Sequence, residues 1–213
     1  MLLRDVMTTN VVTIPSDTSL AEARRAMDFH KLRRLPVVDR ARLVGLVSRD
    51  GLDRAGPSKL TTFSMHELTY LLSKITVKEI MSTDLFVLPP DATVEEAVAL
   101  GQQKQMGSVM VVDDGVLVGI ATTNDFFYKI VNPILGIGLG GSRLSIHDCG
   151  RPEDVAKVLG TVASMGIRLL TIFCVPHPDT GAHDLTLHVD VEDPSTLIEE
   201  LGKVGWTVHE RAR

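Results

Sequence analysis

The sequence predicts a mixed α/β (α+β) fold made of a doubled unit and a separate C-terminal domain. Residues 6–48 and 80–122 align without a gap at an offset of 74, and 12 of the 43 paired positions are identical. Unrelated sequences of this composition would share about three. The tail reads as a domain of its own, with a different order of elements. In a doubled unit each copy can bury its open face on the other, which leaves two clefts where the copies meet.

Each copy is predicted to contain an extended segment, a helix, two strands and a second helix. Both first helices begin at a capping box, Ser19-x-x-Glu22 in one copy and Thr93-x-x-Glu96 in the other. The strands are short apolar runs separated by a tight turn. The predicted extended segments and strands are 11–15, 35–38 and 43–47 in the first copy and 85–89, 109–112 and 117–121 in the second, and the second helix is clearest at 125–131.

The remaining segments are a helix between the copies, a linker and the tail. Residues 64–75 have amphipathic helical spacing, which is most simply a packing element and alternatively an exposed docking helix. Residues 132–142 contain Pro133 and four glycines and are predicted to be a linker. The tail shows the order βαββαβ, the ferredoxin-like plan. Its predicted strands are 143–147, 168–175, 184–191 and 205–210, and its helices are 152–165 and 194–203.

Two phrases of the doubled unit resemble cystathionine-β-synthase (CBS) domains: RRLPVVD…RLVGLVS in the first copy and VMVVDDGVLVGIATTND in the second. A tandem CBS pair is called a Bateman module, and the resemblance covers residues 1 to about 132. The stretch EDVAKVLGTVASMGIRLLTI in the tail is similar to part of an ACT domain, a small regulatory module. The combination resembles the AcuB type of acetoin-utilisation protein. We therefore expect CBS repeat 1 at 1–62, CBS repeat 2 with the helix before it at 63–132, a linker at 133–142 and an ACT-like domain at 143–213.

Composition limits the classes of function. The formal net charge is −5, which argues against sequence-independent nucleic-acid binding because such binding needs a basic surface. The two cysteines, Cys149 and Cys174, have no metal-site spacing and favour reduced thiols of a cytoplasmic protein. No apolar run reaches the length of a membrane span, and the N-terminus has no signal-peptide pattern. We expect a cytoplasmic protein that contacts neither nucleic acid nor membrane.

The main candidate site lies at the end of the last strand of the second copy. The hydroxyl of Thr122 and the free N–H groups of the following helix suit a phosphate, and Asp125 can accept hydrogen bonds from a vicinal diol such as a ribose. The CBS resemblance implies that this pair binds an adenosine nucleotide. It also implies that the phosphate meets Arg33 and Arg34, which can fork onto its oxygens. The base is expected near Asn10 and Val12.

The matching cleft on the other side is predicted to be weaker. The gapless alignment places Ser48 opposite Thr122, but Gly51 stands opposite Asp125, and Asp50 is one position early. Ser108 takes the place of Arg34, and Phe86 that of Val12. This second cleft, made of Ser48, Asp50, Phe86 and Ser108, therefore lacks a diol acceptor and a cation in register.

Simpler interpretations of the same residues stay open. Thr122 could serve only as a helix N-cap, and Asp125 only as an acidic residue in the first turn of that helix. Arg33 and Arg34 could be solvated surface charges. Gly136-x-Gly138-x-x-Gly141 matches a dinucleotide motif, but it follows a helix and precedes a strand, so we interpret it as a hinge. The tail histidines His147, His177, His183 and His188 lie on different elements and lack metal-site spacing.

The function expected from these observations is regulation without an active site. The CBS pair would bind an adenine nucleotide (AMP, ADP or ATP) as a regulatory ligand and transmit its occupancy to a homodimer or a regulated enzyme. No cofactor or metal is expected. An enzyme that uses the cleft as its active site, and a structural dimerisation scaffold with vestigial clefts, are the two rival hypotheses.

Overall fold

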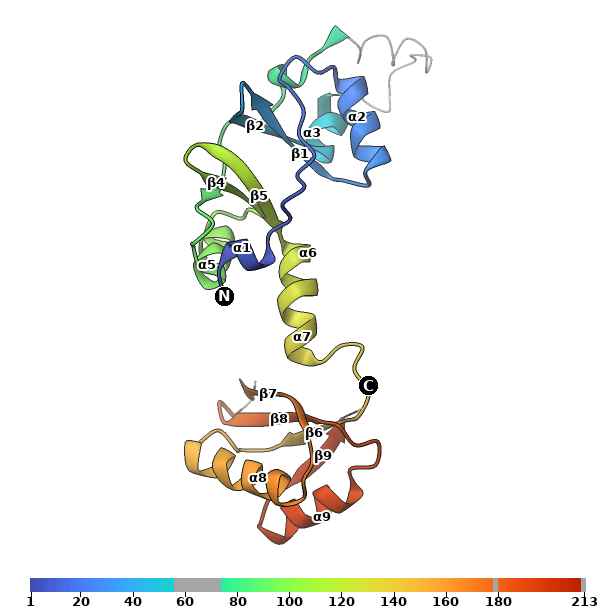
Figure 1. The fold of residues 1–213 in the computed structure, drawn as a ribbon, viewed down its shortest axis with the longest axis vertical. Helices are drawn as coiled ribbons and strands as arrows, with labels where there is room; N and C mark the ends of the chain where they lie inside the picture. The colour runs from blue at the N-terminus through green and yellow to red at the C-terminus, as the bar shows by residue number, and fades with distance from the viewer. Residues whose placement is uncertain (56–73, 178–179, 212–213) are drawn as a thin grey trace. The chain divides into compact units, whose positions relative to one another are not determined.

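The computed structural model describes residues 1–55, 74–177 and 180–211. The chain divides into two compact units, Met1–Phe126 and Phe127–Arg213 (Figure 1). The helix predicted over 64–75 falls almost wholly outside the described residues.

The doubled sequence forms two matching β-hairpins in the first unit. Repeat 1 contributes β1 (Arg34–Asp39) and β2 (Arg42–Ser48), and repeat 2 contributes β4 (Ser108–Asp113) and β5 (Val116–Thr122). Both hairpins are antiparallel, and their cross-strand pairs match at the offset of 74, including a bulge in each. Because one-residue slips would turn every apolar side chain to the wrong face, this agreement shows that the repeated pattern sets the register.

Helices flank the hairpins as the capping signals predict. Ser19 and Glu22 make both bonds of a capping box at the start of α2, and Thr93 accepts the Glu96 N–H at the start of α5. The other elements of this unit, in chain order with these two, are α1 (Leu3–Val6), α2 (Leu20–Phe29), α3 (Arg49–Ala55), the 3-10 turn η1 (Val77–Glu79), β3 (Val87–Leu88), α5 (Val94–Gln103) and α6 (Thr123–Phe126).

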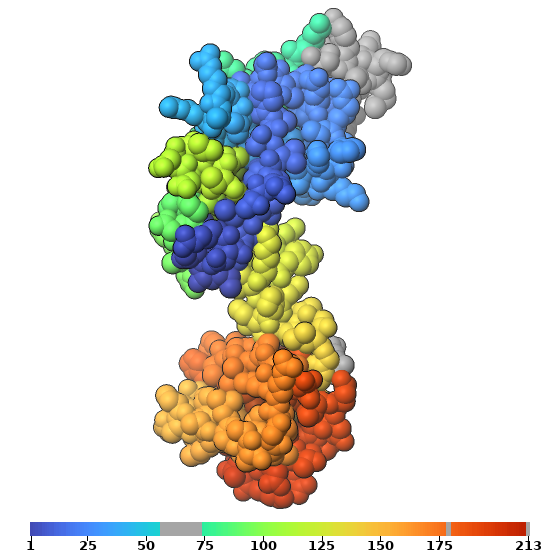
Figure 2. Space-filling model, viewed as in Figure 1, coloured from blue at the N-terminus to red at the C-terminus, as the bar shows by residue number. Residues whose placement is uncertain are grey.

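Each repeat lends its leading segment, residues 2–8 or 76–82, to the other repeat. The N–H of Thr8 donates to Ile120 of β5 at 2.8 Å, and the equivalent N–H of Ser82 donates to Leu46 of β2 at 2.9 Å. Leu3 and Val77, which begin the short helices in these segments, are fully buried. Figure 2 shows the dark blue N-terminal residues lying against the green residues of repeat 2. The exchange joins the two repeats into one compact unit.

Two of the twelve identical pairs, Met7/Met81 and Gly45/Gly119, meet at this exchange. A Cβ atom added to Gly119 would lie 2.3 Å from Sδ of Met7, and one added to Gly45 would lie 2.4 Å from Sδ of Met81. The methionine of one repeat therefore packs directly on the bare glycine of the other. A side chain at either glycine would force the methionine side chain of the other repeat to move.

The helix after β5 is longer than predicted. α6 continues into a π-helical turn (Phe127–Val131) and then α7 (Asn132–Leu135), which belong to the second unit. The linker predicted from residue 132 thus begins as helix. Proline is tolerated in the first turn of a helix because its missing N–H would have no partner there, so Pro133 starts α7 instead of ending it. Gly136, with a φ of 62°, closes the helix in the left-handed region.

The tail has the predicted βαββαβ order. The four strands form an antiparallel sheet in the order β7-β8-β6-β9, and both helices cover one face of it (Figure 1). The core lies between the helices and the sheet and contains Leu144, Ile146, Leu185, Val158 and Leu197. The elements are β6 (Ser142–Ile146), α8 (Pro152–Ser164), β7 (Leu169–Pro176), β8 (His183–Val189), α9 (Ser195–Lys203) and β9 (Val208–Arg211).

Candidate functional site

A pocket of about 520 Å³ lies between the two repeats of the first unit. One wall comes from repeat 1, after α2 and at the start of β1, and the other comes from the junction of β5 and α6. All six residues of the main predicted site are among those that line it. The lining residues are Thr8, Asn10, Val11, Val12, His30, Lys31, Leu32, Arg33, Arg34, Pro36, Gly107, Ile120, Thr122, Thr123, Asn124 and Asp125.

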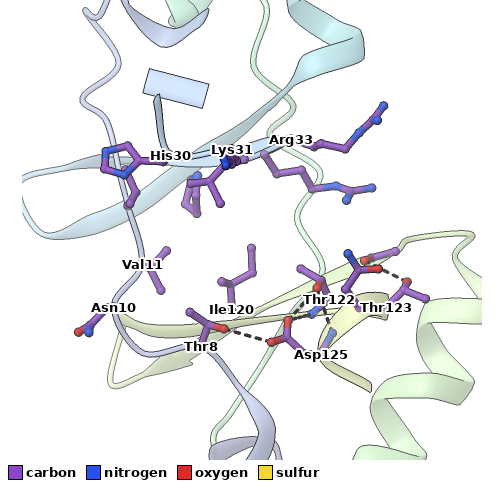
Figure 3. A pocket seen from close by; sticks show the side chains of 16 residues that line it. Thr8, Asn10, Val11, His30, Lys31, Arg33, Ile120, Thr122, Thr123 and Asp125 are labelled. Atoms are coloured by element: carbon purple, nitrogen blue, oxygen red, sulfur yellow. Dashed lines mark hydrogen bonds between the residues drawn. The ribbon is translucent and has the colours of Figure 1, made fainter. Parts of the chain in front are cut away.

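The carboxylate of Asp125 accepts three hydrogen bonds in the pocket wall at the start of α6. Its Oδ2 accepts the N–H of Thr122 at 2.9 Å and the hydroxyl of Thr122 at 2.7 Å. Its Oδ1 accepts the hydroxyl of Thr8 at 3.1 Å, so the leading segment of repeat 1 is held to repeat 2 beside the pocket (Figure 3). A vicinal diol could reach this carboxylate by replacing the Thr8 hydroxyl, because both groups donate in the same way.

The opposite wall is basic. Arg33 extends into solvent with 75% of its side chain exposed, and its guanidinium lies 3.4 Å from a carboxylate oxygen of Asp50. Arg34 begins β1, and its Nη2 lies 3.5 Å from the place of a Cβ atom on Gly107. Figure 3 shows Lys31 and Arg33 on the side of the pocket that faces Thr122 and Asp125. A long, exposed ion pair is weak, so the Arg33 guanidinium can exchange Asp50 for an anion in the pocket.

Ten of the 16 lining residues were not predicted from the sequence, and three of them, Thr8, His30 and Lys31, carry polar or basic side chains that bear on the chemistry of the site. Thr8 donates to Asp125 only because the leading segments are exchanged. The sequence signal that could have indicated Thr8 is its alignment with another hydroxyl residue, Ser82. His30 and Lys31 end α2 next to the two arginines, and Lys31 has a φ of 54°. The equivalent Gln105 has a φ of 55°, so this tight turn is a feature of both repeats. The run of basic residues before β1 was the signal for Lys31.

Two of the four residues of the weaker cleft line a second cavity. Phe86 and Ser108 line a smaller cavity of about 310 Å³ beside α5, whereas Ser48 and Asp50 are not among its lining residues. The hydroxyl of Ser48 accepts the N–H of Gly51 at 3.1 Å, which repeats the contact between Asp125 N–H and Thr122. The backbone geometry is therefore preserved while the carboxylate is missing. Asp50 instead faces Arg33, a residue of the main pocket.

The cysteines of the tail do not form a reactive pair. Both are free; Cys149 is buried in the core and Cys174 is exposed. Burial raises the pKa of the Cys149 thiol to about 11, and nearby Asp154 adds to this shift. A thiol with so high a pKa is almost entirely protonated at neutral pH and is a poor nucleophile.

The described residues contain neither a candidate membrane span nor a candidate metal site. None of their helices has the length and apolar character that a membrane span requires. Within residues 1–55, 74–177 and 180–211, no group of three or more His, Cys, Asp or Glu side chains is placed to hold a metal ion.

Comparison with known proteins identifies relatives of the first unit. The profile of the CBS domain matches residues 3–57 and 77–132. A curated relative, the inosine-5'-monophosphate dehydrogenase of Korarchaeum cryptofilum, is 30% identical over 161 residues, which are 73% of this chain. This chain spans 31% of the length of that enzyme.

Two solved structures resemble the first unit. One is a protein of Vibrio cholerae assigned to acetoin utilisation (AcuB), with 29% identity and a TM-score of 0.52 over 62% of this chain and 91% of that chain. The other is the CBS domain pair of protein MJ0100 in complex with 5'-methylthioadenosine and S-adenosyl-L-methionine, with 25% identity and a TM-score of 0.51. It covers 62% of this chain and 97% of that chain.

Proposed function

The chain belongs to the CBS-domain family, and we propose that its first unit is a regulatory sensor that binds one adenine nucleotide in the pocket at Thr122 and Asp125. The observation that carries the proposal is the charge of the two pocket walls. A hydrogen-bonded carboxylate stands at the β5–α6 junction, and four basic side chains stand across from it. They are His30, Lys31, Arg33 and Arg34.

The ribose is assigned to Asp125. Its carboxylate accepts the Thr8 hydroxyl at 3.1 Å, and a ribose hydroxyl is the same kind of donor. Exchanging one hydroxyl for another keeps this carboxylate oxygen hydrogen-bonded, so the exchange costs little free energy. The released Thr8 hydroxyl can in turn accept or donate to the ligand.

The phosphate is assigned to Thr122, Arg33 and Arg34. The two guanidinium groups offer planar pairs of donors that match phosphate oxygens. The Thr122 hydroxyl donates to Asp125 at 2.7 Å, so it would turn away from that carboxylate to donate to the phosphate. The two guanidinium groups support AMP, ADP or ATP over the ligands of the MJ0100 pair. 5'-Methylthioadenosine has no phosphate, and the sulfonium of S-adenosylmethionine is a cation that the basic wall would repel.

The adenine base is assigned to the apolar part of the pocket. Val11, Val12, Pro36 and Ile120 line it, with Asn10 as the polar side chain at hand. Such surroundings bind a flat aromatic ring through burial and fix its orientation with few polar contacts.

Occupancy is proposed to act through the exchange of leading segments. A ligand that contacts Arg33 of repeat 1 and Asp125 of repeat 2 stabilises the arrangement in which these walls are close. The chain would pass this change to a homodimer contact or to a regulated enzyme in the cytoplasm. The resemblance to AcuB makes acetoin or central carbon metabolism the proposed setting. We propose no catalytic step and no cofactor.

A thermal-shift panel with the full chain tests the proposal. AMP, ADP and ATP at about 100 times their Kd should raise the Tm of the first unit by roughly 8 °C. Adenosine and 5'-methylthioadenosine should raise it less, and S-adenosylmethionine least. If no ligand at millimolar concentration raised the Tm, the result would contradict the proposal and favour the hypothesis of a structural scaffold with vestigial clefts. Conversion of the nucleotide, followed by chromatography, would show an enzyme and overturn the proposal.

A further inference from the structure

The open face of the tail sheet, on the side away from α8 and α9, carries a row of polar residues. Side chains alternate between the two faces of a strand, so the neighbours of the core residues Leu144 and Leu185 point to the open face. In register across three strands, Ser145 of β6 pairs with Thr186 of β8 and His209 of β9. A cavity of about 370 Å³ lies on this face. Its lining residues are Ser145, His147, Val175, Pro176, His177, Asp184, Thr186, His209 and Arg211.

Three imidazoles surround this cavity. The ring centroid of His147 lies 5.0 Å from that of His209 and 6.4 Å from that of His177. These residues come from the ends of different strands, and the sheet order β8-β6-β9 brings two of them side by side. Arg211, two residues after His209 on β9, faces the same cavity. Four nitrogen-bearing side chains thus border one cavity.

The single carboxylate among the lining residues is satisfied within the protein. Asp184 Oδ2 lies 3.1 Å from Nδ1 of His147, and Oδ1 accepts the N–H of Asp148 at 3.2 Å. A carboxylate only accepts, so Nδ1 of His147 carries the proton of this contact and Nε2 is directed elsewhere. Although burial opposes ionisation, the hydrogen bond from Asp148 and the nearby His147 keep the pKa of Asp184 below its usual value. Asp184 is therefore an ionised partner that fixes the His147 ring.

One lining side chain lacks a partner. Thr186 is 2% exposed, and its hydroxyl oxygen makes no hydrogen bond to any described residue. Buried hydroxyl groups in native proteins nearly always have a partner, and leaving one unpaired is costly. An unpaired hydroxyl beneath a cavity lined by imidazoles indicates a group that is bound there.

The chemistry of the cavity favours an anion over a metal ion. Among the described residues no group of three or more His, Cys, Asp and Glu side chains is placed to hold a metal ion. Imidazolium rings and a guanidinium spaced around a cavity instead suit the several oxygens of one anion. We propose that this cavity binds a small oxyanion, a free or ligand-borne carboxylate or phosphate group, through His147 Nε2, His209, Arg211 and the Thr186 hydroxyl.

One carboxylate faces four basic side chains at this cavity. The charged groups around it are Asp184 of β8, His147 after β6, His177 after β7, and His209 and Arg211 of β9. Because Nδ1 of His147 is committed to Asp184, Nε2 is the atom of that ring left to meet an anion.

Histidine Cε1–H signals in NMR spectra of the full chain give the test. Acetate and inorganic phosphate, titrated separately, should shift the signals of His147, His177 and His209 with saturation and leave His183 unmoved. Comparison of the two probes identifies which group the site prefers. The double variant His209→Gln/Arg211→Gln should weaken binding about tenfold or more, and Thr186→Val about tenfold without loss of stability. The matched control is His183→Gln/Arg151→Gln, which removes one histidine and one arginine outside the cavity.

Three results would overturn the proposal. The first is no saturable shift with either probe at pH 6. The second is unchanged affinity in both the double variant and Thr186→Val, with the Trp206 fluorescence of each variant showing a folded tail. The third is that zinc chloride alone saturates the same three histidines far below the concentrations that either anion needs, because the cavity would then be a metal site.

Discussion

Placing a methyl group at Gly119 tests the exchange of leading segments. In Gly119→Ala the new Cβ atom would lie 2.3 Å from Sδ, 2.9 Å from Cγ and 3.2 Å from Cβ of Met7. The first two distances are too short, so the Met7 side chain must change its rotamer and the leading segment must shift. Overpacking of this kind costs about 1–3 kcal/mol, from which a glycine-to-alanine gain of about 0.4–1 kcal/mol in chain entropy is subtracted. We expect a net loss of about 1–2 kcal/mol in the unfolding free energy of the first unit.

Urea unfolding separates the first unit from the tail. The single tryptophan, Trp206, packs against the core of the tail, so its fluorescence follows the tail alone. Far-UV circular dichroism follows both units. With a slope of about 2 kcal/mol per molar urea, Gly119→Ala should lower the midpoint of the first-unit transition by roughly 0.5–1 M and leave the Trp206 midpoint unchanged.

A double-mutant cycle assigns the loss to the contact with Met7. In a Met7→Ala background Sδ and Cγ are absent, and only Cβ of residue 7 remains, 3.2 Å from the added methyl group. Gly119→Ala should therefore become nearly neutral. The coupling energy should be about 1–2 kcal/mol. The matched pair Gly45→Ala and Met81→Ala should behave in the same way, because the distances are nearly equal. Equal losses in the presence and absence of Met7 would refute the cross-repeat packing.

Three further predictions concern the pocket, the buried thiol and the boundary between the units. Arg33→Ala/Arg34→Ala should weaken AMP binding about tenfold or more but leave adenosine binding nearly unchanged, whereas the exposed pair Arg25→Ala/Arg42→Ala should change neither in calorimetry. A thiol reagent at pH 8 should label Cys174 and should reach Cys149 only when the tail unfolds; fast labelling of Cys149 in the folded chain would contradict this. Because burial raises the folded-state pKa of Cys149, the contribution of this thiol to stability is present below pH ~8.5 and is lost as the pH rises toward about 11. A fragment ending at Leu135 should keep the nucleotide affinity of the full chain, and loss of binding would mean that the tail contributes to the site.

The sequence predicted the repeats and their registers because a period of two fixes which residues face the core. The offset of 74 reappears in every hairpin pair, and the six residues proposed for the main site line one pocket. The exchange of leading segments was not predictable, because Leu3 and Val77 carry the same apolar signal whichever repeat they cover. The contact between Thr8 and Asp125 depends on that exchange and was missed with it.

Other differences have local causes. Pro133 and the glycines after it indicated a linker from residue 132, but the helix continues to Leu135 because proline fits a first turn. Ser48 and Asp50 align with the pocket residues of repeat 2, yet Asp50 pairs with Arg33 of its own repeat, because the long arginine side chain reaches the start of α3. The tail histidines looked scattered along the chain. Only the strand order, with β6 between β8 and β9, brings His147 and His209 to one cavity.

Calorimetric titration of AMP into the full chain and into Asp125→Asn tests the central claim most directly. Asparagine keeps the shape of Asp125 but loses the charge that strengthens its bonds to a ribose, so affinity should fall about tenfold to a hundredfold. Asp114→Asn, in the exposed turn between β4 and β5, is the control for lost charge and should bind as the wild type does. We expect one AMP per chain in the wild type. Two equivalent sites per chain, or wild-type affinity in Asp125→Asn, would contradict the account.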